Sequence, residues 1–309
     1  MSLQLRERDA LARARTGESM PPGSLDDDSW VQFGLQALLS VAGRIRLLAE
    51  HAAVSKVKAD GSPTTVLESE IEALVRRALK DFAPGASFLG EETGGSLEEA
   101  GWTVVLDPID GTYAYLGHTE TFASVMTIFE DGEPRIGLIA SPLTGEVGYA
   151  VTGERSRLLR LDVFGEGHQG VDLPQAAGEA SPVLVNVHPA RHAGHALDTL
   201  MEGWREKRVR MVRAPGGSPS WALLGAARGH FTYVNLWEAA EAAPWDLAAG
   251  LLVVRGAGGE VVDLAGHPID PVGHRGPFIA GVRREHRDRV RELLRSTRSG
   301  PGGEAGPEE

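Results

Sequence analysis

The sequence has no cysteine in 309 residues. This absence excludes disulfide bonds, thiolate nucleophiles and cysteine-ligated zinc. Any bound metal must therefore be held by carboxylates, carbonyl oxygens or imidazoles, a set of ligands that favours hard cations over soft ones.

Basic residues are outnumbered, because 31 Lys and Arg stand against 43 Asp and Glu and give a formal net charge of −12. A chain with this excess of negative charge repels a phosphate backbone, and no long Lys/Arg stripe with interleaved aromatic residues is present. We therefore expect no nucleic-acid partner. An anionic small substrate would need a bridging cation.

Long apolar segments are also missing. The longest, from Leu247 to Val254, has eight residues including a glycine, whereas a helix that spans a bilayer needs about 20. The first twenty residues alternate charged with short aliphatic residues and contain no apolar core of a secretory signal. The sequence thus predicts a cytoplasmic protein without a membrane partner.

The sequence as a whole has 42% hydrophobic and 24% charged residues, a composition typical of a folded protein. We expect a flexible N-terminal arm over residues 1–24 and a disordered tail over residues 299–309, neither of which carries chemistry. Between them, residues 25–180 are predicted to form helices plus an antiparallel sheet, and residues 181–298 an α/β half.

The spacing of hydrophobic residues and the turn signals predict where the main helices and strands lie. Ser29 and Gln32 form a possible capping box before a long helix that runs to about Leu48, and a second helix is predicted from Leu67 to Phe82. The dipeptide Asp131-Gly132 predicts a hairpin turn. Short β-type runs are expected at 102–106, 122–129, 135–139, 147–151 and 158–161, followed by strands at 183–187, 209–212, 230–234, 260–264 and 277–282 that alternate with helices.

The strongest chemical pattern lies at residues 102–112, where a buried-looking strand leads into Asp107-Pro-Ile-Asp110-Gly-Thr. Asp107, Asp110 and the Ile109 carbonyl can offer oxygens to hard cations, and the Gly111 and Thr112 amides lie where a phosphate could bind. The alternative is an ordinary turn that ends a strand, because Asp-Pro and Asp-Gly both favour turns.

Two weaker patterns accompany it. Glu91, in Gly90-Glu91-Glu92, follows a short apolar run, and a solvated loop is the alternative interpretation. Asp246, in Pro244-Trp245-Asp246, opens a small-residue helix that ends near Gly258-Gly259, and its alternative role is to stabilise the helix N-terminus.

Together the three motifs resemble those of the inositol monophosphatase family of magnesium-dependent sugar and inositol phosphatases, over roughly residues 29–295. The resemblance implies a layered α-β-α-β-α sandwich of the inositol monophosphatase and fructose-bisphosphatase type, and by analogy a possible homodimer. It implies that two or three Mg²⁺ ions bind a set of five ligands: Glu91, Asp107, the Ile109 carbonyl, Asp110 and Asp246.

The resemblance also implies roles in catalysis and substrate binding. Glu91 and Thr112 would orient the attacking water, with Asp110 in the catalytic set. The Gly111 and Thr112 amides would hold the phosphate, and Asp246 and Asn235 would contact the substrate.

Two positions depart from the family pattern. Glu68 stands where the family has Asp, which leaves the third ion open, and capping of a helix is its alternative role. Asn235 stands where inositol-type members carry a substrate-binding Glu, and the segment 235–244 is longer than usual. Glu238 or Glu241 could replace that contact, or could lie in a solvated loop.

Other conspicuous residues favour structural interpretations. His188, His192 and His195 cluster in the sequence, but they lack an acid at matching spacing, so we expect no metal site there. Trp221 is expected to belong to the core.

The predicted function is a Mg²⁺-dependent phosphomonoesterase that hydrolyses a small polyol, sugar, cyclitol or amino-alcohol phosphate, of the inositol-1-phosphate or histidinol-phosphate type, by metal-activated water. One alternative is a phosphatase for nucleoside 3′,5′-bisphosphates or sugar bisphosphates. An alternative of another class is a catalytically idle protein that binds metal and phosphate esters.

Overall fold

The computed structural model describes residues 26–48, 54, 56–57, 63–161, 168–174, 182–186, 194–214, 217–236 and 242–296. The expected arm at residues 1–24 and the expected tail at residues 299–309 both lie outside this part of the chain. Within it, no helix combines the length and apolarity needed to cross a membrane.

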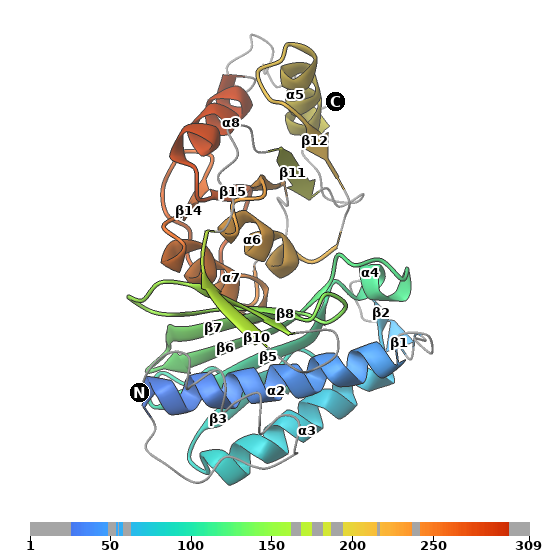
Figure 1. The fold of residues 1–309 in the computed structure, drawn as a ribbon, viewed down its shortest axis with the longest axis vertical. Helices are drawn as coiled ribbons and strands as arrows, with labels where there is room; N and C mark the ends of the chain where they lie inside the picture. Colours follow the sequence, from blue (N-terminus) through green and yellow to red (C-terminus); the bar gives the residue numbers. More distant parts are fainter. Residues whose placement is uncertain are drawn as a thin grey trace, which may run out of the picture.

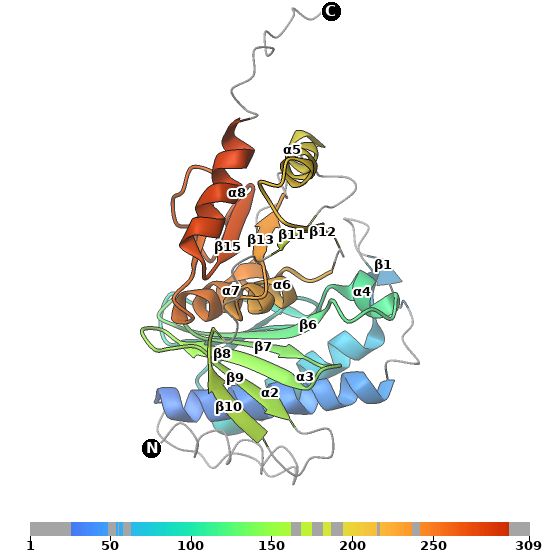
Figure 2. The ribbon, with the colours of Figure 1, turned by 45° about the horizontal axis from the view of Figure 1, so that its top comes forward.

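The elements stack in five layers (Figure 1). Helices α2 (Asp27–Leu48) and α3 (Val66–Phe82) cover one face of a large sheet, and α6 (Pro219–Ala227) and α7 (Pro244–Gly256) cover the other. A smaller sheet follows, with α5 (Gly194–Arg205) and α8 (Arg284–Ser296) on its outer side, as Figure 2 also shows. The predicted α-β-α-β-α sandwich is confirmed.

The large sheet has eight strands in the order β10-β9-β8-β7-β6-β5-β3-β4. Their bounds are β3 Ser87–Gly90, β4 Gly94–Gly95, β5 Trp102–Asp110, β6 Ala123–Glu130, β7 Glu133–Ser141, β8 Glu146–Val151, β9 Arg157–Leu161 and β10 His168–Asp172. The expected antiparallel meander is present, and the predicted turn at Asp131 and Gly132 joins β6 to β7 with φ values of 50° and 78°. One pair, β3 with β5, is parallel instead.

The small sheet has the order β12-β11-β13-β15-β14. Its strands are β12 Val212–Arg213, β11 Val183–Asn186, β13 Thr232–Asn235, β15 Phe278–Gly281 and β14 Glu260–Asp263. β11 is parallel to β12 and to β13, while β15 is antiparallel to its neighbours. Two further strands, β1 (Lys56–Val57) and β2 (Pro63–Thr64), pair with each other.

Two sequence predictions need correction. Helix α2 begins at Asp27, before the expected box at Ser29, because Asp26 Oδ1 accepts the Ser29 amide at 2.9 Å and caps the helix first. The strand expected at 209–212 covers only Val212–Arg213, because the amides of Arg208 and Val209 bond to Gly203 O and complete the end of α5.

Small residues bring α7 close to the large sheet. A Cβ on Gly137 of β7 would lie 2.8 Å from the Ala249 backbone, and Ala248 is fully buried against Val105 and Phe129. The run Ala248-Ala249-Gly250, which follows Asp246, is therefore explained by the close packing of α7 on the sheet. This close contact holds the N-terminal end of α7, with Asp246, against the strands that carry the aspartate motif.

Candidate functional site

Strand β5 ends in a bulge that presents two aspartates. The register shifts between Asp107 and Asp110, and Ser124 Oγ on β6 donates to Pro108 O at 2.7 Å within the irregular stretch. The Ile109 amide donates to Asp107 Oδ1 at 2.9 Å. Both aspartates are buried, with 3% and 6% of their surface exposed.

The N-terminus of α6 connects the aspartate motif to α7. Ser218 Oγ and the Ser220 amide both donate to Asp110 Oδ2, and Ser220 Oγ donates to the Asp246 carbonyl at 3.3 Å. Ser218 Oγ also accepts the Trp221 amide as the helix N-cap. Two motifs that are more than 130 residues apart in the sequence therefore meet through Ser220.

Ser218 and Ser220 are not among the residues predicted from the sequence. A readable signal was present, because Ser-Pro-Ser directly before an expected helix is typical of an N-cap followed by proline in the first turn.

Gly111, directly after β5, lies close to the backbone at the start of α6. Its φ is 92°, and a Cβ there would lie 2.9 Å from the Ser218 amide nitrogen. Only glycine combines this backbone conformation with that distance at low cost.

We expect Gly111→Ala to reduce turnover strongly while the protein stays folded. The added methyl would strain the backbone and push Ser218 away from Asp110, at a cost of about 1–3 kcal/mol in the free energy of unfolding. Steady-state kinetics and urea unfolding measure the two effects. Gly85→Ala, where a Cβ meets nothing within 4 Å, is the matched control, and equal behaviour of the two variants would contradict this account.

Glu91 reaches the aspartates because of the parallel pair of strands. Gly90 is in register with Leu106, and the Glu91 amide donates to Leu106 O at 3.2 Å. Burial raises the pKa values of Asp107 and Asp110, and the negative charge of Glu91 raises them further. The structure therefore brings together three of the acids that the sequence singled out.

A buried acid on α3 holds the loop that carries Glu91. Glu72 is fully buried, and its carboxylate accepts the amides of Glu92 and Thr93, each at 2.8 Å, and the Thr93 hydroxyl. Glu72 is not among the residues predicted from the sequence. A charged side chain on the apolar face of the helix, between Ile71 and Val75, was the available signal.

We expect Glu72→Ala to lower the affinity for divalent metal and to destabilise the protein by about 1–3 kcal/mol, because it leaves buried amides without an acceptor. Calorimetric metal titration and urea unfolding are the measurements. Glu70→Ala, an exposed acid on the same helix, is the control. If metal affinity is unchanged in Glu72→Ala, Glu72 does not position the loop.

Glu68 both caps α3 and contacts the site. Its carboxylate accepts the Thr65 amide, which completes a capping box, and Thr112 Oγ1 lies 3.1 Å from Glu68 Oε1 and 3.2 Å from Ile109 O. Burial raises the pKa of Glu68 to about 7. The capping interpretation is confirmed, and the same carboxylate also fixes the Thr112 hydroxyl.

Burial and mutual repulsion dominate the electrostatics of the site. Burial raises the pKa of Asp107 well above its ordinary value, and Glu91 and Asp110 raise it further. Burial raises the pKa of Asp110 to about 6, although Ser218 and Ser220 act against the shift. No Lys or Arg is among the main causes of these shifts.

This donor set fits a hard cation in chemistry, since it offers carboxylate and carbonyl oxygens. As the side chains stand in the described ranges, no three acids or histidines converge closely enough to hold one ion. Asp246 Oδ2 accepts the Ala243 amide at 2.7 Å, as its helix-capping interpretation predicts. The assignment of metal ligands therefore stays a prediction.

Comparison with known proteins identifies the family. A profile of the inositol monophosphatase family matches residues 26–298. An inositol-1-monophosphatase ImpA from Mycolicibacterium smegmatis is 31% identical over 236 residues, which cover 74% of this chain and 79% of that protein. The chain belongs to the inositol monophosphatase family.

Other members of the inositol monophosphatase family support the same assignment. A histidinol-phosphatase from Mycobacterium tuberculosis is 32% identical over 219 residues, which cover 68% of this chain and 77% of that protein. An inositol monophosphatase structure from Thermotoga maritima shares the fold, with a TM-score of 0.67 and 21% identity over 86% of this chain and 97% of that one. The chain is thus a phosphoric monoester hydrolase of a metal-dependent family.

Asn235, the position at which the sequence predicts a departure from the family pattern, lies in the small sheet. It is the last residue of β13, is 5% exposed and lies in register with Asn186, and no hydrogen-bond partner reaches its Oδ1 within the described residues. Two strand positions earlier, the buried Tyr233 lies near Asp110, whose charge helps to raise the pKa of the phenol. The end of β13 is therefore close to the aspartate site.

Among the remaining candidate residues, the structure describes the side chain of Trp221. Trp221 packs against the core, with its ring 6.2 Å from that of Phe231, so the core interpretation is confirmed. His188, His192, Glu238 and Glu241 lie outside the described residues, as does the side chain of His195.

Proposed function

We propose that this enzyme is a Mg²⁺-dependent phosphatase for small polyol or amino-alcohol phosphate monoesters. The observation that carries the proposal is that Glu91 lies beside the buried Asp107 and Asp110: burial raises the pKa values of the two aspartates, and the charge of Glu91 raises them further. Such a site is stabilised by a divalent cation and then attracts a phosphate dianion.

The chain supplies the metal ligands and the amides that would bind the phosphate. Glu91, Asp107, the Ile109 carbonyl, Asp110 and Asp246 would hold two or three Mg²⁺ ions, which lower the pKa of water and neutralise phosphate oxygens. The Gly111 and Thr112 amides, at the start of the short helix α4 (Thr112–Leu116), would bind the phosphate.

Water is oriented by an acid and a hydroxyl. Because Thr112 Oγ1 can donate its proton to Glu68 Oε1, its lone pairs stay available to accept a hydrogen bond from the attacking water. Glu91, held by the Glu72 loop contacts, would accept the water's other proton.

The substrate class follows from the relatives and from Asn235. The two relatives with the stated identities are named for histidinol phosphate and for inositol 1-phosphate. The Asn235 amide, with an unpartnered buried oxygen, would accept a hydrogen bond from a substrate hydroxyl or amine where a carboxylate serves in inositol-type members.

The test is release of inorganic phosphate from a panel of esters with Mg²⁺, with EDTA, and with lithium added. The panel contains inositol 1-phosphate, histidinol phosphate, fructose 1,6-bisphosphate and a nucleoside 3′,5′-bisphosphate. We expect a monoester to be turned over fastest and EDTA to abolish turnover. Preference for a bisphosphate would contradict the substrate class, and metal binding without turnover of any ester would favour an idle binding protein.

We expect Asn235→Glu to change KM between histidinol phosphate and inositol 1-phosphate more than it changes kcat. The substitution adds a charge at the end of β13 without touching the acids that would hold metal. Kinetics on both esters measure the effect. An unchanged substrate profile would show that Asn235 does not contact substrate.

A further inference from the structure

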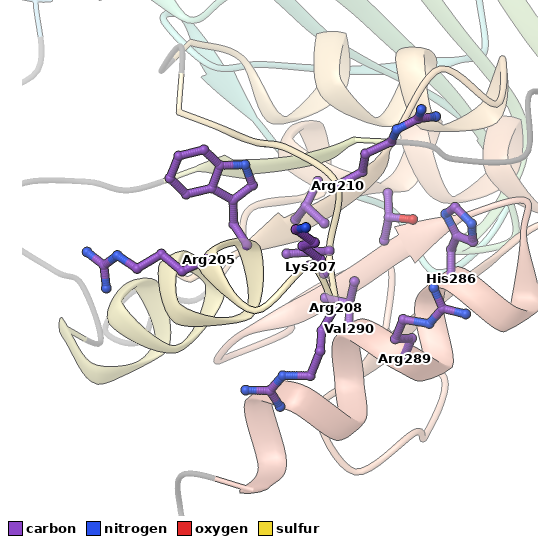
Figure 3. Close-up of a pocket in the computed structure, with 11 residues that line it drawn as sticks. Arg205, Lys207, Arg208, Arg210, His286, Arg289 and Val290 are labelled. Atoms are coloured by element: carbon purple, nitrogen blue, oxygen red, sulfur yellow. The ribbon is translucent and has the colours of Figure 1, made fainter.

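A cavity of about 750 Å³ lies beside the small sheet, at the first residues of β11 and β13. It is formed by the end of α5, the loop after it and α8 (Figure 3). The charged residues that line it are all basic, and no acid is among the lining residues: Arg205, Lys207, Arg208, Arg210, His286 and Arg289.

The cations of this basic pocket are mostly uncompensated. Arg208 pairs with Glu206 at 2.5 Å. Arg205, Lys207, Arg210 and Arg289 have no ion-pair partner within the described ranges, and each is exposed. In a protein with a net charge of −12, this concentration of positive charge creates a local potential that attracts anions.

The backbone at Lys207 adds an independent observation. Its φ is +62°, and it occupies the position just after α5 where glycine is usual, because the following amides turn back to Gly203 O. A lysine in this left-handed conformation is strained relative to glycine. Figure 3 shows Lys207 between the end of α5 and α8, where it lines the basic pocket.

An aromatic ring stands at the rim. Trp204 lines the cavity and its surface is 47% exposed, which is unusual for a tryptophan. A cavity lined by an indole and several guanidinium groups suits a ligand that joins a planar ring to phosphates, because bases stack on indole and arginines bind phosphate oxygens in pairs. The cavity volume is within the range of pockets for ligands of that size.

The basic pocket is separate from the aspartate site. Val183 and Thr232, which line it, are the first residues of β11 and β13. Asn235 is the last residue of β13, near Asp110. The two sites therefore lie at opposite ends of the same strand.

We propose that the basic pocket binds a nucleoside di- or triphosphate at a site distinct from the catalytic centre. The phosphates contact Lys207, Arg210 and Arg289, and the base stacks on Trp204. The proposal does not depend on the reaction at the aspartate site.

The experiment is calorimetric titration of the full chain with ATP, ADP, AMP and inorganic tripolyphosphate in EDTA. Without a divalent cation the aspartate site repels phosphates, so binding reports the basic pocket. We expect ATP to bind more tightly than ADP, AMP to bind weakly, and affinity to fall with added salt.

Single substitutions test which residues of the basic pocket contact the nucleotide. Lys207→Gly removes the charge and relieves the backbone, so we expect unchanged or higher thermal stability with ATP affinity about tenfold or more lower. Arg289→Gln should weaken ATP to a similar extent, whereas Arg77→Gln on α3 and Asp110→Asn should leave it unchanged. Trp204→Ala should weaken ATP but not tripolyphosphate.

Three outcomes would overturn the proposal. ATP affinity could be equal in the wild type and Lys207→Gly. It could fall equally in Arg77→Gln, which would indicate an effect of overall charge. Tripolyphosphate could bind as tightly as ATP, and Trp204→Ala could leave the ATP affinity unchanged. This result would exclude a pocket that is specific for nucleotides.

Discussion

Asp110→Asn should lower kcat by roughly a thousandfold or more while the protein stays folded. The change removes one anion from the set that would hold the cations, and a divalent cation contributes most of the charge stabilisation in such a reaction. The Asn oxygen can still accept from Ser218 and Ser220, so the link to α6 is kept. Steady-state phosphate release at saturating Mg²⁺ is the measurement.

The matched control is Asp198→Asn, an exposed aspartate on α5. It changes the net charge by the same amount and should have normal kinetics. Circular dichroism and thermal unfolding verify that both variants are folded. Near-normal turnover of Asp110→Asn would refute the catalytic assignment of the aspartate motif.

The metal-free protein should lose stability as the pH rises from about 5 to 8. The pKa of Asp110 is raised from 3.8 to about 6 and that of Glu68 from 4.5 to about 7. The folded chain then binds more protons than the unfolded chain between these values, so the free energy of unfolding falls as the pH passes through the folded-state pKa values. A shift of two units corresponds to about 3 kcal/mol, and the coupled groups contribute less than their sum.

Urea unfolding in EDTA at pH 5 and pH 8 measures this loss. Mg²⁺ at pH 8 should restore the stability, because the cation offsets the repulsion between the ionised acids. Glu68→Gln should flatten the pH dependence, since it removes one titrating group. A metal-free protein that is equally stable at both pH values, or that is more stable at pH 8, would contradict the electrostatic description of the site.

The fold was predictable where a local pattern decides the structure. Helical spacing located α3, and Asp131-Gly132 located the β6–β7 hairpin, because both depend on residues close in sequence. The first residue of α2 was missed since Asp26 and Ser29 are both good N-caps and only the structure selects between them. The parallel pairing of β3 with β5 was missed because a short apolar run does not specify its partner.

The residues of the candidate site also fall into two groups, those that a sequence motif identifies and those that only the tertiary structure identifies. Asp107, Asp110 and Glu91 stand in motifs of recognisable composition, so their sequence neighbours identify them. Glu72 and Ser220 act across the fold, on a loop 20 residues away and on a helix 26 residues away. Their partners follow from tertiary packing, which a single sequence does not display.

Counting Mn²⁺ by electron paramagnetic resonance tests most directly whether acids from distant segments share one metal centre. We predict that the wild type binds at least two ions per chain and that Glu91→Gln, Asp110→Asn and Asp246→Asn each lower the affinity about tenfold or more, with Asp198→Asn unchanged. Wild-type affinity and stoichiometry in Asp246→Asn or Glu91→Gln would show that these segments do not meet at a metal, and would contradict the account.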